Sequence, residues 1–86
     1  TNKQNYLERK AEQARIRKLK NDILKVEEKI KTNEERLNEL DELLADPEIA
    51  KNSAKLNEIS KEQDKISETL DKLMAQWEEL SDLLDE

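Results

Sequence analysis

Apolar residues recur along this chain at alternating steps of three and four, the spacing of the a and d positions of a heptad repeat. The first run consists of Ile16, Leu19, Ile23, Val26, Ile30, Leu37, Leu40 and Leu44, with Asn33 in its one polar slot. The second run consists of Leu56, Ile59, Ile66, Leu70, Leu73, Trp77, Leu80 and Leu84, with Gln63 in its polar slot. A strict seven-residue repeat imposes a left-handed supercoil. The pattern therefore predicts two long helices packed as a left-handed coiled coil.

A short polar segment containing the only proline separates the two runs. Asp46 is suited to cap a helical turn that begins at Pro47, and proline disfavours helical backbone at the residue before it. Asn52 or Ser53 can cap the next helix. We therefore predict a first helix to about residue 45, a corner over 46–53 and a second helix from about 54. A connection this short makes the two helices antiparallel neighbours.

The register of this hairpin follows from folding the chain about its corner. Facing residues then have numbers that sum to about 100, so Ile16 faces Leu84 and Ile23 faces Trp77. In this register the second run ends where the first begins. This favours a single intramolecular hairpin that spans residues 16–86 rather than two unrelated helical segments. The predicted fold class is all-α, an antiparallel two-helix coiled-coil hairpin, and we expect a monomer. Trp77 is expected to pack in its core, and the alternative is that it serves as a binding hot spot.

The two polar slots fall in adjacent layers of this register. Asn33 and Gln63 are therefore expected to fix the pairing of the helices, at some expense of stability. Because each helix buries a single stripe against one partner, the core is expected to be thin.

Composition excludes most catalytic sites. The chain has no Gly, Cys or His, so it lacks a phosphate-binding glycine loop, a thiol nucleophile, a disulfide and the usual zinc ligands. Its paired glutamates, Glu27-Glu28, Glu34-Glu35 and Glu78-Glu79, are expected on exposed helical positions with no pocket to line, and its serines have no neighbouring base. We expect no catalytic, cofactor-binding or metal-binding residue and no enzymatic activity in this chain. It has no apolar run of about 18 residues, so we expect no membrane span.

Charge is divided unevenly along the sequence. The net charge is −6, yet residues 1–20 hold two acidic residues against seven basic ones, namely Lys3, Arg9, Lys10, Arg15, Arg17, Lys18 and Lys20. The apolar pattern is absent before Ile16, so residues 1–15 are expected to form a basic linker or an overhanging helix without a hairpin partner. Lys3, Lys10 and Arg17 repeat every seven residues and so form one stripe on a helix, and Tyr6 lies beside this stripe and can stack on a base. These seven residues are our candidates for binding nucleic acid, and the alternative is a solvated basic linker.

Three stretches of the chain resemble one known module. They are Arg17-Lys18-Leu19 leading into Glu27-Glu28-Lys29-Ile30, then Leu43-Leu44-Ala45-Asp46-Pro47-Glu48, and finally Trp77-Glu78-Glu79-Leu80. Together they are similar to the C-terminal coiled-coil domain of the ABC-F ATP-binding cassette proteins. The resemblance covers nearly the whole chain. Lys51-Asn52-Ser53 departs from it, because many relatives have a second aspartate–proline turn there.

This resemblance implies a parent protein that is a cytoplasmic ATPase, with two ATPase domains before this module and ATP bound only there. Such proteins act on ribosomes, so the implied partner of the basic end is ribosomal RNA or DNA. The parent's own ATPase domains are another possible partner, and no membrane is implied. Arg15, Arg17, Lys18 and Lys20 match the family's basic approach to the hairpin.

Two other functions remain open from the sequence. The chain could be a structural arm that binds proteins through its exposed helix faces. It could also be the helical domain of a peptide-release factor, which likewise has an Asp-Pro-Glu corner, although Trp77-Glu78-Glu79-Leu80 fits that domain less well.

Overall fold

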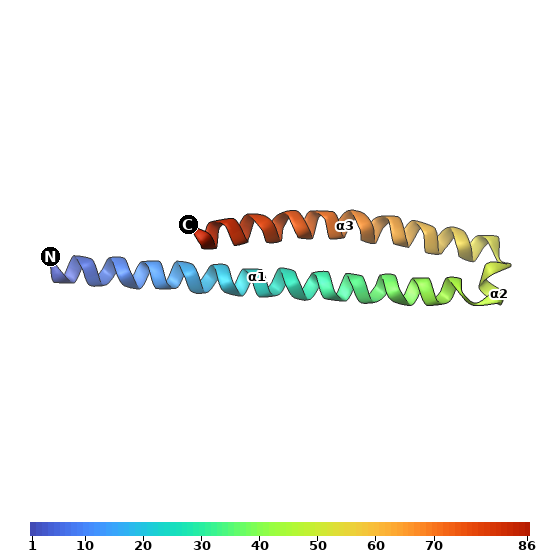
Figure 1. Ribbon diagram of the computed structural model, residues 1–86, viewed down its shortest axis with the longest axis horizontal. Helices are drawn as coiled ribbons and strands as arrows, with labels where there is room; N and C mark the ends of the chain where they lie inside the picture. Colours follow the sequence, from blue (N-terminus) through green and yellow to red (C-terminus); the bar gives the residue numbers. More distant parts are fainter.

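The fold is a long helical hairpin, described by a computed structural model over all residues, Thr1–Glu86. Its elements are α1 (Asn2–Leu44), the single turn α2 (Pro47–Ala50) and α3 (Ser53–Asp85), with no strand. Figure 1 shows α1 and α3 running antiparallel side by side, with α2 forming the corner between them. The molecule measures 74 × 15 × 15 Å. The predicted all-α antiparallel hairpin is confirmed.

The corner is built by two helix caps. Asp46 has extended backbone (φ −76°, ψ 122°), and its Oδ1 accepts a hydrogen bond from the Glu48 N–H at 2.9 Å while Pro47 begins α2. Asn52 then caps α3, its Oδ1 accepting from the Lys55 N–H at 3.1 Å. Both side chains satisfy helix N–H groups that have no partner within the helix. The reversal of the chain is therefore encoded locally.

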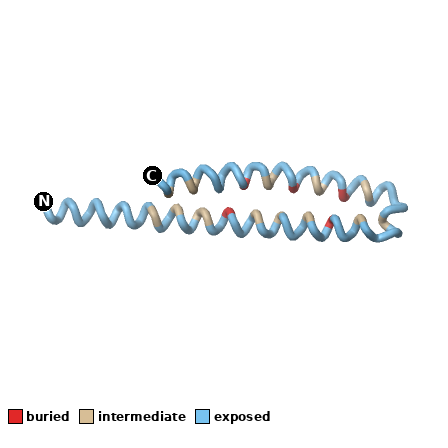
Figure 2. Tube along the Cα trace, viewed as in Figure 1, coloured by how far each residue is buried: buried red, intermediate tan, exposed pale blue.

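The core consists of a single line of side chains. With Ile16 and Leu56 assigned to a positions of the heptad abcdefg, each d position follows an a position by three residues. The five buried residues all occupy d positions, and they are Val26, Leu40, Ile59, Ile66 and Leu73. Leu40 is the most enclosed at 1% exposure, and it clusters with Ile59 and Ile66. Most residues at a positions are only half-buried. Figure 2 shows that the buried positions lie where the two helices face each other. With one layer of packing, this line must provide most of the hairpin's stability.

The polar slots behave differently from each other. The Gln63 Nε2 donates a hydrogen bond across the hairpin to the Asp41 Oδ1 at 3.2 Å, so this residue does link the two helices. The Asn33 Nδ2 instead donates to the Lys29 carbonyl of its own helix at 2.8 Å. Of the pair expected to fix the register, only Gln63 bonds to the opposite helix.

Trp77 departs from the sequence-based expectation. It is 40% exposed, so its prediction as a core residue is wrong. Only one helix faces this position, and part of the large indole therefore has no neighbour. The side chain lies at the edge of the helix pair, where it lines an open groove with Ile30 and Met74.

The N-terminal part of α1 extends beyond the end of α3. Arg15 lies level with the last residues of α3, because its Nη1 donates to the Leu83 carbonyl at 3.4 Å. Every residue from Thr1 to Arg15 is exposed. Figure 1 shows this N-terminal part of α1 continuing past the C-terminus with no helix beside it. We call residues 2–14 the overhang.

Candidate nucleic-acid interface

One face of the overhang gathers basic and aromatic side chains. A shallow hollow of about 440 Å³ is lined there by Tyr6, Arg9, Lys10, Gln13, Ala14 and Arg17. These positions follow steps of three, one, three, one and three, so they form one stripe on a helix. Tyr6 is 63% exposed. The hollow therefore joins three of the seven candidate cations with the aromatic ring predicted beside them.

Five of the seven candidate residues have no ionic partner within the protein. The structure contains six ion pairs, and none of them involves Lys3, Arg9, Lys10, Arg17 or Lys20. Lys3 lies one heptad before Lys10, on the same stripe. Because their charges are uncompensated and solvated, these five residues are available to a phosphate group.

Arg15 and Lys18 are already engaged. The Arg15 Nη2 contacts the Glu12 Oε1 at 2.8 Å, and its Nε bonds the other carboxylate oxygen at 3.1 Å. These hydrogen bonds raise the pKa of Arg15 and lower the pKa of Glu12. The Lys18 Nζ contacts the Asp22 Oδ2 at 3.1 Å. These two residues therefore differ from the other five candidates, although the sequence alone did not distinguish them.

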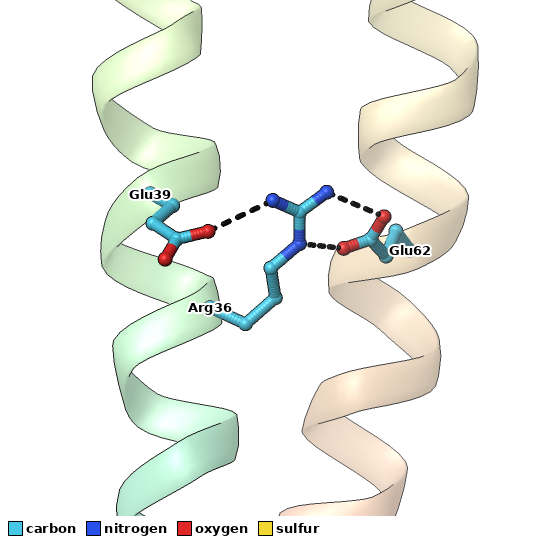
Figure 3. A network of polar contacts seen from close by, with 3 residues as sticks. All are labelled: Arg36, Glu39 and Glu62. Carbon is cyan, nitrogen blue, oxygen red and sulfur yellow. Dashed lines mark hydrogen bonds and ion pairs between the residues drawn. The ribbon is translucent and has the colours of Figure 1, made fainter.

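The most connected polar group lies away from this stripe, in the half of the hairpin nearer the corner. Arg36 of α1 binds Glu62 of α3 through two hydrogen bonds and also binds Glu39 of its own helix (Figure 3). Hydrogen bonds from Arg36 lower the pKa of Glu62, and those to Glu62 and Glu39 raise the pKa of Arg36. With both carboxylates neutralising it, Arg36 stabilises the hairpin rather than offering a free charge.

A second hollow, on the hairpin, was not predicted from the sequence. It has a volume of about 380 Å³ and is lined by Glu27, Ile30, Lys31, Glu34, Met74 and Trp77. The expectation that the paired glutamates line no pocket is therefore wrong for Glu27 and Glu34, because the helix pair leaves a groove beside its core. Met74 is 51% exposed. The available signal was that Met74 occupies an e position, beside the core positions rather than within them.

The structure has no group of three or more His, Cys, Asp or Glu side chains that could hold a metal ion. None of its helices has the length and apolar character required to cross a bilayer. The chemistry available at its basic end is the binding of anions by exposed Lys and Arg.

Comparison with known proteins identifies the module. The family described as "ABC transporter C-terminal domain" matches residues 8–82. The chain is 38% identical over 52 residues to YdiF of Bacillus subtilis (strain 168), which is named as an ATP-binding protein, covering 60% of this chain and 8% of that protein. It is 50% identical over 44 residues to peptide chain release factor 1 of the same organism, covering 51% of this chain and 12% of the factor. No solved structure matches the chain.

The family match bears directly on the resemblance seen in the sequence. It spans the overhang from Glu8, the corner and the Trp77-Glu78-Glu79-Leu80 motif, whereas the release-factor likeness covers about half of the chain. The predicted resemblance is confirmed, and this chain belongs to the ABC transporter C-terminal domain family.

Proposed function

We propose that this domain is a non-catalytic module through which a cytoplasmic ABC-F ATPase contacts nucleic acid, most directly ribosomal RNA, during translation. The observation that carries the proposal is the group of five cations without ionic partners on and beside an unpaired helix. The overhang buries no side chain against α3, so packing within the hairpin contributes little to its stability. A polyanion is the partner that matches it.

The binding mode follows from the charge distribution. Lys3, Lys10 and Arg17 repeat every seven residues, so they can follow one phosphate backbone along the overhang. Each contact with a phosphate releases condensed counterions, which favours binding most at low salt. Residues 21–86 hold nine basic and twenty acidic residues, so this part is repelled by phosphates and projects away. Recognition is then of the backbone rather than of base sequence.

A role in translation is supported by the relatives. Peptide chain release factor 1 shares half of the aligned residues over a 44-residue stretch. The likeness to YdiF supports an ATP-binding parent, whose nucleotide sites lie outside this chain. Since this chain covers only 8–12% of these two relatives, ATP hydrolysis and action on the ribosome belong to the proposal.

The proposal is tested by reversing charge on the stripe. In the triple variant Lys10→Glu, Arg17→Glu and Lys20→Glu, binding to a fluorescently labelled RNA duplex should be lost in an anisotropy titration at low salt. The matched control is Lys51→Glu, Lys61→Glu and Lys65→Glu, which changes the net charge equally. These three lysines are also exposed and unpaired, but they lie on the acidic part of the hairpin.

The two variants together separate local contact from overall charge. The control variant should bind RNA several-fold more weakly than the wild type, but its binding should remain measurable. Its substitutions change only the long-range electrostatic attraction to RNA, not the proposed phosphate contacts. Equal loss in both variants would show that net charge alone governs binding. Undiminished binding in the stripe variant would overturn the proposal.

A further inference from the structure

The groove beside Trp77 is an exposed apolar surface with an acidic border. Its floor is formed by Ile30, Met74 and Trp77. Leu24, which is 63% exposed, lies one turn before Glu27 on the same side of α1. Four large apolar side chains are thus accessible along one flank of the hairpin. Such a patch on a charged surface is characteristic of an interaction site.

The border of this groove carries excess negative charge. Glu27 and Glu34 lie on its α1 side beside Lys31. On α3, Asp71 and Glu78 lie three residues before and four residues after Met74, and so share its face. None of these four carboxylates takes part in an ion pair within the protein. The groove is therefore complementary to a partner that presents apolar side chains together with Lys or Arg side chains.

The two flanks of the hairpin differ in a way that keeps this groove open. On the opposite flank, Arg36 and Glu62 at g positions join the helices. On the groove flank, Asp41 at an e position of α1 accepts a hydrogen bond from Gln63, but this bond lies nearer the corner than the groove does. The e positions of α3 on this flank hold Ser60, Ser67, Met74 and Ser81. Three of these side chains are too short to reach across to α1. Met74 and Trp77 therefore border a gap that no side chain of this molecule fills.

We propose that this groove binds a cationic amphipathic helix from a partner protein. Such a helix lays its apolar face into a groove while its Lys or Arg side chains meet the acidic border. Trp is the residue most enriched at binding hot spots, and Met adapts its shape to different partners. Nucleic acid is a poor occupant, because Glu27, Glu34, Asp71 and Glu78 repel phosphates. The site shares no residue with the basic stripe, so the two proposals can fail independently.

Trp77 supplies the readout, because it is the only Trp in the chain. The probe is a synthetic 15-residue helical peptide with Leu along one face and Lys on the other. Two control peptides replace either every Lys by Glu or every Leu by Ser. Titration of the whole chain with the Leu–Lys peptide should shift Trp77 emission to shorter wavelength and saturate, and neither control peptide should do so.

Matched variants locate the peptide on the protein. Met74→Ala and the double variant Glu27→Gln with Glu34→Gln should each weaken binding by about three- to tenfold. Leu83→Ala removes a comparably exposed apolar side chain outside the groove, and Glu28→Gln with Glu35→Gln removes two charges from the outer face of α1. Both of these controls should bind as the wild type does.

Three results would overturn the proposal. The first is equal binding of the Leu–Lys and Leu–Glu peptides. The second is an equal effect of groove and control variants. The third is self-association of the protein alone in sedimentation equilibrium that Met74→Ala abolishes, because the occupant would then be a second copy of this chain.

Discussion

Arg36 of α1 and Glu62 of α3 form a bidentate ion pair between the helices, in the half of the hairpin nearer the corner. The Arg36 Nε and Nη2 donate to the two carboxylate oxygens, the Nη2–Oε1 distance being 3.1 Å, while Nη1 donates to Glu39 at 2.9 Å (Figure 3). The guanidinium group is therefore held by a carboxylate of each helix, Glu39 of α1 and Glu62 of α3. This geometry fixes the relative position of the helices one layer away from the buried Leu40.

A lysine cannot reproduce this arrangement, because an ammonium group lacks the planar fork of donors. Arg36→Lys should therefore lower the midpoint of thermal unfolding, measured by circular dichroism at 222 nm. The decrease should be smaller than that caused by truncating Leu40, since the pair is exposed to solvent. Arg9→Lys, on the unpaired overhang, should leave the midpoint unchanged. Equal midpoints for Arg36→Lys and the wild type would show that a simple charge is sufficient there.

The same pair predicts a pH dependence. Arg36 lowers the pKa of Glu62 below its ordinary value of 4.5, so the unfolded chain binds this proton more readily than the folded one. The stabilisation is fully present above pH 4.5 and is lost as the pH falls through the folded-state pKa. The difference in unfolding free energy between wild type and Glu62→Gln should thus be constant near neutral pH and shrink below pH 4.5. Because both proteins keep Glu12, the comparison isolates Glu62. A difference that persists unchanged in strong acid would contradict this account.

Leu40 should be the most sensitive core position. It is 1% exposed and contacts residues of both helices, so Leu40→Ala should destabilise the hairpin by about 2–5 kcal/mol in urea unfolding. Leu43→Ala is the matched control, because Leu43 is partly exposed at a g position and its truncation should cost less than about 1 kcal/mol. Similar losses for the two variants would mean that packing is not concentrated on the d line.

The N-cap of α3, Asn52, should contribute to the stability of the hairpin independently of the core. Asn52→Ala removes the acceptor of the Lys55 N–H and should cost about 1 kcal/mol. Asn57→Ala makes the same substitution inside α3 at an exposed position, where Ala's higher helix propensity should leave stability equal or slightly greater. Urea unfolding of both variants measures the contrast. If Asn52→Ala were as stable as Asn57→Ala, the corner would not depend on this cap.

Local sequence signals predicted the hairpin well. The heptad spacing identified the residues that face the partner helix, and Asp46, Pro47 and Asn52 marked the corner, because caps and proline act within a few residues. The register rule also holds for the pairs observed across the hairpin, such as Arg36 with Glu62. Period and caps depend on near neighbours in the chain, which is why one sequence suffices to infer them.

The exposure and the hydrogen-bond partners of individual side chains could not be predicted from the sequence where several arrangements fit the same heptad pattern. Heptad position places Trp77 in the core, but it cannot show that a single facing helix leaves the indole partly uncovered. Arg15 and Arg17 are the same type of residue and lie two positions apart, yet only Arg15 contacts Glu12 and the end of α3. Asn33 bonds within its own helix rather than across the hairpin. Such choices between competing partners are made by three-dimensional packing.

The central claim is that the unpaired cations of α1 bind phosphates, and the salt dependence of RNA binding by single variants tests it most directly. For about four contacts to a duplex, the logarithm of the association constant should fall against the logarithm of salt concentration with a slope of about −3 to −4. Arg17→Gln should reduce the slope by about 1, whereas Arg15→Gln should leave it nearly unchanged, because Arg15 is engaged with Glu12 and Leu83. A slope near zero for the wild type, or equal slopes for Arg17→Gln and the wild type, would contradict the account.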